Sequence, residues 1–310
     1  MDFRPHDDTA HWTQNLDLKA SVLLVAAGIL FFSDPLFSSK NFYYRDILNF
    51  HYPLRRVLID SWARGEFPLW NPFIYLGQPM LANPNYMAFY PSNIFHALMP
   101  FNYAFKLHFI IHPLLAGVGL YLLQRRIGIQ RLAALGGSIV YQFSGALLSF
   151  LNLYNIVPAI ALIPWIAWAF LGALQGNWWR RSLLFGLLLG LQVIAFEPLM
   201  FQCNLFLLAG LALYHFFESK DRRRAALSVG RAGLVGCLLA PALAAIQVLP
   251  TLELMPLSSR GAGYNLATTS KWSMHWADFG NVIIPNLFGS PFTVNRATYW
   301  GESFHDNSAS

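Results

Sequence analysis

Long apolar segments separated by short polar connections dominate the pattern of hydrophobic and polar positions along this chain. A membrane-spanning helix needs about 20 mainly apolar residues, with a usable range of roughly 17–25. Seven segments approach that length: 21–37, 107–123, 132–151, 156–174, 183–196, 199–217 and 232–252. The fifth is short and ends at Glu197-Pro198, so we expect a tilted helix or a tight hairpin with the sixth. The pattern predicts an all-α, polytopic integral membrane protein with about seven transmembrane helices.

Composition supports this prediction and narrows the class of protein. Hydrophobic residues make up 55% of the chain and charged residues 12%, whereas a soluble domain carries about 25% charged residues. Because water does not solvate so much apolar surface favourably, lipid must cover part of it. The net charge of +6 comes largely from Lys and Arg in short connections. That pattern is typical of membrane topology and not of nucleic-acid binding.

The Lys and Arg residues also predict the orientation of the helices. By the positive-inside rule, the connections that carry them belong in the cytoplasm. They occupy every second connection: Arg125, Arg126 and Arg131; Arg180 and Arg181; and Lys220, Arg222, Arg223 and Arg224. We therefore expect a cytoplasmic tail at 1–19 and a transmembrane domain at 20–255 that includes an outer loop at 38–104. Residues 256–310 are expected to form another outer loop, cut before further helices, so that the sequence is the N-terminal part of a longer protein.

The outer loop 38–104 has the sequence of an ordered structure. Residues 46–64 predict an amphipathic helix of the kind that lies on a bilayer surface, and Pro53 should kink it or end its first turn. Turns that contain proline or glycine follow at close intervals: 65–72, 77–79, 83–85 and 90–92. Proline fixes φ and glycine permits tight turns, so these residues predict a rigid, shaped loop. Long ordered loops are usually functional.

Two acidic residues are candidates for chemistry at the predicted outer face. Asp46 closely follows the first apolar segment, where a carboxylate can act as a general base or a metal ligand. Alternatively, Asp46 is the N-cap of the amphipathic helix. Glu197 interrupts an apolar run, and ionisable groups at membrane depth usually mark a functional site. The alternative for Glu197 is a loop residue that simply reaches water.

Basic residues and a histidine pair are further candidates. Three cations in the predicted outer layer suit an anionic lipid head group: Arg55, Arg56 and Lys106. Alternatively they are interfacial cations whose stems lie along apolar surface, with Arg56 and Asp60 forming a weak surface pair. His108 and His112 are four residues apart, a spacing that can hold a metal. Because there is no HExxH motif and no obvious third ligand, we interpret them as buried or pore-lining imidazoles.

A group of short motifs in the outer loop resembles a known family. The motifs are Tyr44-Arg45-Asp46, Pro53, Gly65-x-x-Pro68-Leu69-Trp70-Asn71-Pro72, Gly77-x-Pro79, Asn83-Pro84 and Tyr90-Pro91. Together they resemble the first outer loop of bacterial YfhO-like membrane proteins. Tyr141-Gln142-Phe143-Ser144-Gly145, in the third apolar segment, looks like a second shared stretch.

The resemblance implies a fold and an activity. YfhO-like proteins are placed with the GT-C glycosyltransferases, multi-helix enzymes that take a sugar from a polyprenyl-phosphate carrier. The implied acceptor is a cell-envelope glycopolymer, lipid or protein at the outer face of the bacterial inner membrane, and no nucleic acid is involved. The resemblance implies that Asp46 is the catalytic base or metal partner. Glu197 is the second catalytic candidate because it interrupts an apolar run, and the resemblance does not assign it a role. Asp46 is flanked by Arg45 and Ile47 and not by a second acidic residue, so the use of a divalent cation stays open.

Residues of the same layer and of the shared motifs are the expected substrate contacts. They are Arg45, Arg55, Arg56, Trp70, Asn71, Asn83, Tyr90 and Lys106.

Two other classes of protein stay open. A transporter or flippase for a lipid-linked or envelope substrate also has many helices, but its broken helices should recur in corresponding halves of the chain. The sequence shows no internal repeat, and a long rigid loop after the first helix favours an enzyme. The remaining class is a non-catalytic assembly partner in which Asp46 only caps a helix.

Overall fold

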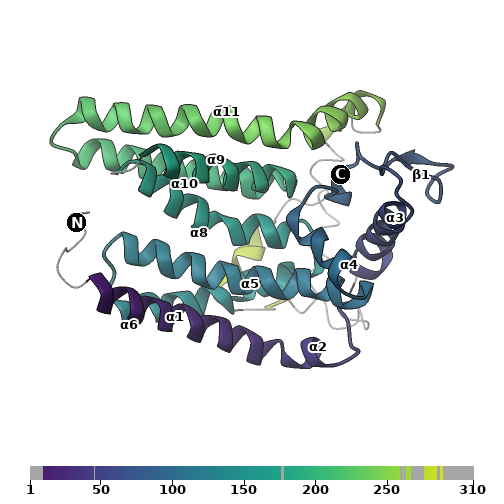
Figure 1. Ribbon diagram of the computed structural model, residues 1–310, viewed down its shortest axis with the longest axis horizontal. Helices are drawn as coiled ribbons and strands as arrows, with labels where there is room; N and C mark the ends of the chain where they lie inside the picture. The colour runs from purple at the N-terminus through teal and green to yellow at the C-terminus, as the bar shows by residue number, and fades with distance from the viewer. Residues whose placement is uncertain are drawn as a thin grey trace. The chain divides into compact units, whose positions relative to one another are not determined.

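The computed structural model describes residues 10–44, 46–175, 178–258, 261, 263–266, 276–284 and 287–288. The chain divides into two compact units, Met1–Leu254 and Met255–Ser310. In the described part of the first unit, nearly all regular structure is helical (Figure 1). Strands β1 (Trp70–Asn71) and β2 (Gln78–Pro79) form a short antiparallel pair. The second unit has three short helices among its described residues: η5 (Met255–Leu257), η6 (Trp276–Phe279) and α13 (Gly280–Ile283).

Long helices that pack side by side form the body of the first unit (Figure 1). They are α1 (Ala10–Phe31), α5 (Phe101–Arg126), α6 (Arg131–Gln142), α8 (Ile156–Ala173), α9 (Trp178–Ile194), α10 (Pro198–Glu218) and α11 (Arg222–Leu254). α9 packs along both α11 and α8, α8 packs along α5, and α5 packs against α6 and α1. Gly186 and Gly190 of α9 lie against Leu239 and Leu243 of α11, and the missing side chains allow this close approach.

Several helices are long and apolar enough to cross a membrane. Among the described residues, five stretches meet this description by length and composition: Phe101–Arg126, Arg131–Asn152, Ile156–Ala173, Pro198–Glu218 and Arg222–Leu257. By helix length and composition, the expectation of an all-α membrane protein with several spans is confirmed. The count of about seven stays a prediction for the other two helices, since α9 has 17 residues and α1 has a polar first half.

The first helix differs from its predicted bounds. We expected a tail at 1–19 and a helix at 21–37, but α1 already begins at Ala10 and ends at Phe31. A turn at Phe32 separates it from α2 (Ser33–Phe37). One charged residue of this polar stretch, Asp17, has partners elsewhere in the fold.

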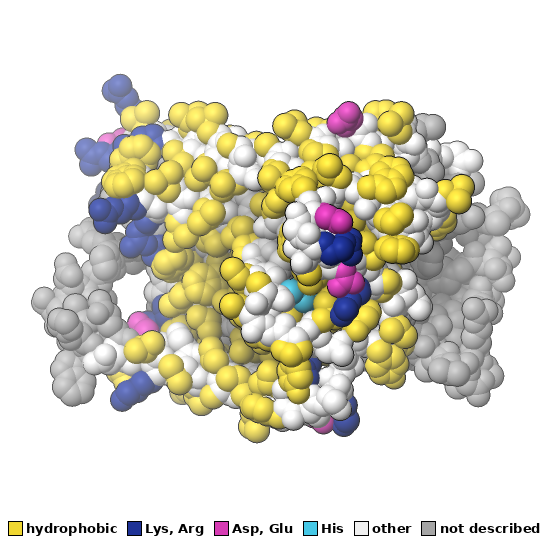
Figure 2. All heavy atoms as spheres, turned by 45° about the vertical axis from the view of Figure 1, so that its right-hand side comes forward, with side chains coloured by type: hydrophobic (Ala, Val, Ile, Leu, Met, Phe, Trp, Pro, Cys, Tyr) yellow, Lys and Arg dark blue, Asp and Glu magenta, His cyan; other side chains and the backbone are white. Residues whose placement is uncertain are grey.

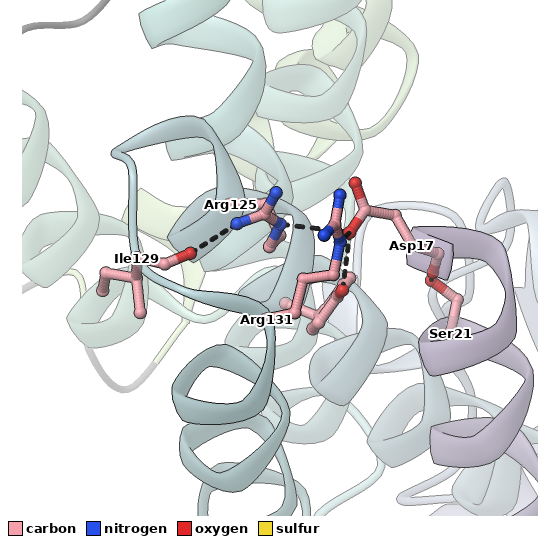
Figure 3. Close-up of polar contacts among 6 residues, drawn as sticks. Asp17, Ser21, Arg125, Ile129 and Arg131 are labelled. Carbon is pink, nitrogen blue, oxygen red and sulfur yellow. Dashed lines mark hydrogen bonds and ion pairs between the residues drawn. The ribbon is translucent and has the colours of Figure 1, made fainter. Parts of the chain in front are cut away.

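Asp17 joins α1 to the connection between α5 and α6 (Figure 3). One oxygen of its carboxylate accepts hydrogen bonds from the Tyr121 hydroxyl at 2.8 Å, Arg125 Nε at 3.1 Å and Arg131 Nε at 3.2 Å. Arg125 also donates to the Ile129 carbonyl oxygen at 2.6 Å, which holds the turn between the two helices. A carboxylate with three donors on two other elements fixes the start of α1 against the bundle.

Removal of the Asp17 charge should loosen this end of the bundle. We expect Asp17→Asn to lower the free energy of unfolding by about 1–2 kcal/mol, because the charge-assisted bonds are partly exposed to solvent. High salt should shrink the difference. The measurement is thermal unfolding in detergent at low and high salt. Asp34→Asn is the matched control, since the Asp34–Lys40 pair is exposed; an equal loss in both variants would contradict the role given to Asp17.

The third predicted span is broken. α6 ends at Gln142, and α7 (Gly145–Ser149) and η4 (Phe150–Asn152) follow after a two-residue interruption. The Ser144 hydroxyl caps α7 by accepting from the Leu147 N–H at 3.2 Å. Gln142 Nε2 donates to the Leu24 carbonyl of α1 at 3.1 Å. The stretch 141–145 therefore ends α6, starts α7 and holds the end of α6 to α1.

The connections rich in Lys and Arg meet at one end of the bundle. Arg126 Nη1 donates to the Trp168 carbonyl near the end of α8 at 2.9 Å. Arg231 of α11 lies over the ring of Trp178 at the start of α9, 5.0 Å from its centre. Figure 2 shows Lys and Arg side chains gathered at this end. The structure thus brings together the three connections that the positive-inside rule assigns to the cytoplasm.

Residues 38–100 fold on the opposite end of the first unit. Their helices are η1 (Ile47–His51), α3 (Tyr52–Ala63), η2 (Pro84–Tyr86), η3 (Pro91–Ile94) and α4 (Phe95–Leu98). They have a small core of their own: Leu54, Leu58, Met80, Tyr86 and Ala88. The predicted amphipathic helix is present, and Pro53 lies where the π-helical turn η1 passes into α3. We call residues 38–100 the outer segment.

Candidate functional site

A cluster of buried polar side chains lies where the outer segment meets the helix bundle. We call it the junction cluster. Its members are His51, Arg55, Ser92, Asn93, His108 and Tyr154, all of them buried. They come from η1, α3, η3, α5 and the connection before α8. Polar groups are buried in this way only where hydrogen bonds or a function compensate for lost hydration.

Arg55 is the charged residue of this cluster. Its side chain is 1% exposed; Nη1 donates to Asn93 Oδ1 at 2.8 Å, and the guanidinium carbon lies 4.4 Å from the ring centre of Tyr154. Nε has no hydrogen-bond partner, and no carboxylate among the described residues forms an ion pair with Arg55. Burial lowers the pKa of Arg55 from its usual value, and Tyr154 and Tyr86 oppose this shift.

A buried cation without an anionic partner is energetically unfavourable by several kcal/mol in general. Stability of the fold alone therefore does not explain why an arginine occupies this position. Ionisable groups in such environments are enriched at functional sites. The positive charge beneath the outer segment is a candidate for attracting an anion to this face.

The histidine pair of α5 is buried and satisfied by hydrogen bonds. His108 stacks on Tyr154 with ring centres 3.6 Å apart, and its two nitrogens lie 2.7 Å from Ser92 Oγ and 2.8 Å from the Tyr154 carbonyl oxygen. His112 lies 2.9 Å from the Tyr90 hydroxyl and 2.6 Å from the His108 carbonyl oxygen. Within the described residues, no three His, Cys, Asp or Glu side chains are grouped as metal ligands. The interpretation of these residues as buried imidazoles is confirmed.

His51 lies one helical turn before Arg55 and is 4% exposed. Its ring stacks against Tyr154, with ring centres 5.9 Å apart, and Nδ1 has no hydrogen-bond partner. Burial, and then the nearby charge of Arg55, lower the pKa of His51 to about 4. His51 is therefore neutral at physiological pH, and the junction cluster carries one positive charge, that of Arg55.

Acid should weaken the attachment of the outer segment through His51. An unfolded histidine titrates near pH ~6.5, whereas folded His51 titrates near 4. Between these values the unfolded state binds more protons, so the stability present above pH ~6.5 is lost as the pH falls. We expect wild type to lose about 1–3 kcal/mol between about pH 6.5 and 4 that His51→Gln does not lose. Thermal unfolding against pH measures this; equal pH slopes in the two proteins would contradict it.

Asp46 lies exposed at the root of the outer segment, directly before η1. Asp46 takes the N-cap position of η1, but its side chain makes no capping hydrogen bond, so the structure gives the interpretation as a helix cap no support. Its carboxylate also has no ion pair, in contrast to the exposed pairs that Asp60 forms with Arg56 and Glu66 forms with Arg64. This statement covers the described residues, and Arg45 lies outside them. The carboxylate is accessible from solvent.

The other predicted basic residues have partners in the protein. Arg56 is exposed, pairs with Asp60 at 3.1 Å and lies over the ring of Phe101 at 5.1 Å. Lys106 is buried; its ammonium group donates to the carbonyl oxygen of Ser38 at 2.6 Å. Lys106 thus fastens the start of the outer segment to α5, and Arg56 is the cation that faces solvent on α3.

Four predicted contacts from the shared motifs shape the outer segment. Asn71 is buried and donates to the Tyr86 hydroxyl at 2.6 Å. The Asn83 side chain accepts from the Asn85 N–H at 3.1 Å and starts η2. Tyr90 is buried against His112, as described above. Trp70 is about half exposed and covers Gly77, where φ is +110° and a Cβ atom would lie 2.4 Å from the indole ring. A substrate contact stays a prediction for all four.

Glu197 lies in the connection between α9 and α10. Phe196 before it has φ of +51°, an uncommon conformation for a bulky residue, and its carbonyl oxygen accepts from Asn155 Nδ2 at 3.2 Å. Partial burial raises the pKa of the Glu197 carboxyl above its usual value. The structure does not bring Glu197 and Asp46 into contact, so a joint role of the two carboxylates stays a prediction.

Sequence reasoning missed four members of the junction cluster: His51, Ser92, Asn93 and Tyr154. The spacing of His51 and Arg55, one turn apart on the buried face of the amphipathic helix, was an available signal. Tyr154 lies in a short connection between two apolar segments, and nothing in its neighbourhood indicates burial.

Comparison with known proteins identifies no relative of this chain. No family model, curated protein or solved structure matches the chain.

Proposed function

We propose that this chain belongs to a membrane glycosyltransferase that transfers a sugar from a polyprenyl-phosphate donor to a cell-envelope acceptor at the outer face of the bacterial inner membrane. The observation that supports the proposal most is the placement of Asp46. Its carboxylate is exposed and makes no capping bond, at the root of an ordered segment that is seated on an apolar helix bundle. A lipid-linked donor would approach from the bundle side and a polar acceptor from the aqueous side.

Inverting transfer of the sugar requires one general base, and Asp46 would supply it. The acceptor hydroxyl gives its proton to Asp46 while its oxygen attacks the anomeric carbon of the sugar. The bond between the anomeric carbon and the phosphate oxygen breaks, and polyprenyl phosphate leaves with the electron pair. The configuration at the anomeric carbon inverts. A positioned base contributes about 10²–10⁴-fold to such a step.

Positive charge near Asp46 would stabilise the departing phosphate. Arg56 faces solvent on α3 and can contact the phosphate directly if it exchanges its partner Asp60. Arg55 lies on the buried face of the same helix and would act through its electric field, since its guanidinium donates to Asn93. Oriented positive charge in a site with little water is a large source of transition-state stabilisation.

The test follows the donor lipid. Membranes of cells that lack the gene should accumulate a polyprenyl-phosphate sugar, detected by mass spectrometry of extracted lipids. That lipid, returned to liposomes with the purified full-length protein and an envelope extract, should lose its sugar and yield polyprenyl phosphate. Movement of the lipid between leaflets without loss of sugar would assign the protein to the flippases. An unchanged lipid profile together with no turnover would contradict the proposal.

A further inference from the structure

A pocket lies at the end of the bundle where Lys and Arg gather. It has a volume of about 230 Å³ and opens between the end of α8, the start of α9, the end of α10 and the start of α11. Its polar lining residues include Trp178, His215, Ser219, Arg224, Ser228 and Arg231. None of the described residues that line it is acidic.

Two arginines of this pocket have donor groups to spare. Arg231 donates through Nε to the Leu227 carbonyl oxygen at 3.2 Å, and its guanidinium lies over Trp178. Its two terminal nitrogens have no hydrogen-bond partner among the described residues. The Arg224 side chain is 85% exposed, and its Nε lies 3.6 Å from an Asp221 oxygen. An exposed pair of that length is weak and exchanges readily for another anion.

The inner wall of the pocket holds a hydroxyl and an imidazole. The buried Ser228 hydroxyl donates to the Ala225 carbonyl oxygen at 2.8 Å and lies 3.3 Å from His215 Nε2. Other cations of the same connection add to the positive potential at the mouth: Lys220, Arg222 and Arg223.

We propose that this pocket binds the phosphate of an anionic phospholipid head group from the leaflet at the basic end of the bundle. Guanidinium groups match phosphate oxygens in geometry and charge. Basic pockets between membrane helices at the cytoplasmic side are typical sites for lipid head groups. The volume is below the roughly 300–1,000 Å³ of pockets for drug-sized ligands, so it suits a head group whose chains stay outside.

The surroundings favour a lipid as the source of the phosphate. Apolar side chains on α10 and α11, within four residues of lining residues in the sequence, are exposed: Leu213, Phe217, Leu227 and Leu234. They offer the acyl chains of a bound lipid an apolar surface next to the head group. A soluble phosphate would use the same arginines but would gain nothing from these residues.

The experiment measures lipid binding to the purified full chain in detergent by native mass spectrometry. Dioleoylphosphatidylglycerol is titrated against dioleoylphosphatidylcholine, and inorganic phosphate is added in a separate competition. We expect a preference for the anionic lipid that Arg224→Ala combined with Arg231→Ala lowers by about tenfold or more. Arg222→Ala combined with Arg223→Ala removes the same charge from the same helix outside the pocket and should change the affinity far less.

Each other outcome would overturn the proposal. Equal losses in both double variants would show diffuse attraction to the basic surface. Equal binding of the two lipids would show no preference for an anion. Displacement of the lipid by inorganic phosphate at similar affinity would make the pocket a site for soluble phosphate. Should the double variant fail to fold, Arg224→Ala alone serves, because its side chain is mostly exposed.

Discussion

Asp46→Asn is expected to lower sugar transfer from the polyprenyl donor by ~10²-fold or more, the loss associated with removing a general base. The amide keeps the size of the side chain and cannot take the acceptor proton. Because the Asp46 side chain caps nothing in the structure, its replacement should leave the free energy of unfolding almost unchanged. The measurement is release of polyprenyl phosphate in liposomes, with the melting temperature in detergent determined in parallel.

Glu66→Gln is the matched control for this prediction. Glu66 is an exposed carboxylate of the same outer segment, and it pairs with Arg64 at 2.8 Å. Its replacement removes the same charge from the same face and should leave the transfer rate unchanged. A rate near wild type for Asp46→Asn would remove Asp46 from the mechanism, and equal losses in both variants would point to a general effect of surface charge.

Arg55→Met is expected to slow transfer by about tenfold while the protein stays folded. If the departing phosphate lies ~10 Å from the charge, the interaction is about 1.7 kcal/mol at an effective dielectric constant of about 20, which is about tenfold in rate. Methionine fills a similar volume without a charge. The unpaired cation costs stability, and its removal offsets the hydrogen bond that Asn93 loses, so the net change in stability should be within about 2 kcal/mol.

Arg55→Lys is the complementary variant: it keeps the positive charge and removes the contacts of the guanidinium group. Lysine keeps the positive charge but lacks the planar group that meets Asn93 and Tyr154, so we expect lower stability and near-normal transfer per folded molecule. Transfer is therefore normalised to folded protein, measured by thermal unfolding and by size-exclusion elution. Full activity of Arg55→Met would show that the charge has no part in the reaction. Unfolding of Arg55→Met with retention of the fold in Arg55→Lys would make the charge structural.

The apolar segments of the sequence predict most of the helices well. The segment expected at 156–174 is α8, Ile156–Ala173. A long continuous apolar run in lipid has few alternatives to a helix, because its backbone polar groups must bond to one another. The amphipathic helix of the outer segment was predictable for a related reason: its apolar residues recur at helical spacing. Pro53 was correctly placed near the end of a first turn, although that turn is π-helical.

Contacts between distant residues explain what the sequence pattern did not predict. Asp17 looks like part of a polar tail, yet it lies within α1 and accepts hydrogen bonds from Arg125 and Arg131. The third span reads as one apolar run, and only the capping hydroxyl of Ser144 indicates the break in it. The pattern of apolar residues predicts which faces are apolar, so it does not identify a polar residue in a connection, such as Tyr154, that tertiary packing buries.

The proposed function requires the outer segment and the basic connections to lie on opposite sides of the membrane. The direct measurement is labelling of single cysteines in intact cells with a membrane-impermeant maleimide, after Cys203 and Cys237 have been replaced by serine. Phe73→Cys lies in the exposed turn between β1 and β2, and Lys220→Cys lies in the exposed connection between α10 and α11. We expect Phe73→Cys to react at once and Lys220→Cys to react only after the membrane is permeabilised. Protection of Phe73→Cys together with reaction of Lys220→Cys would place Asp46 in the cytoplasm and contradict the proposed function.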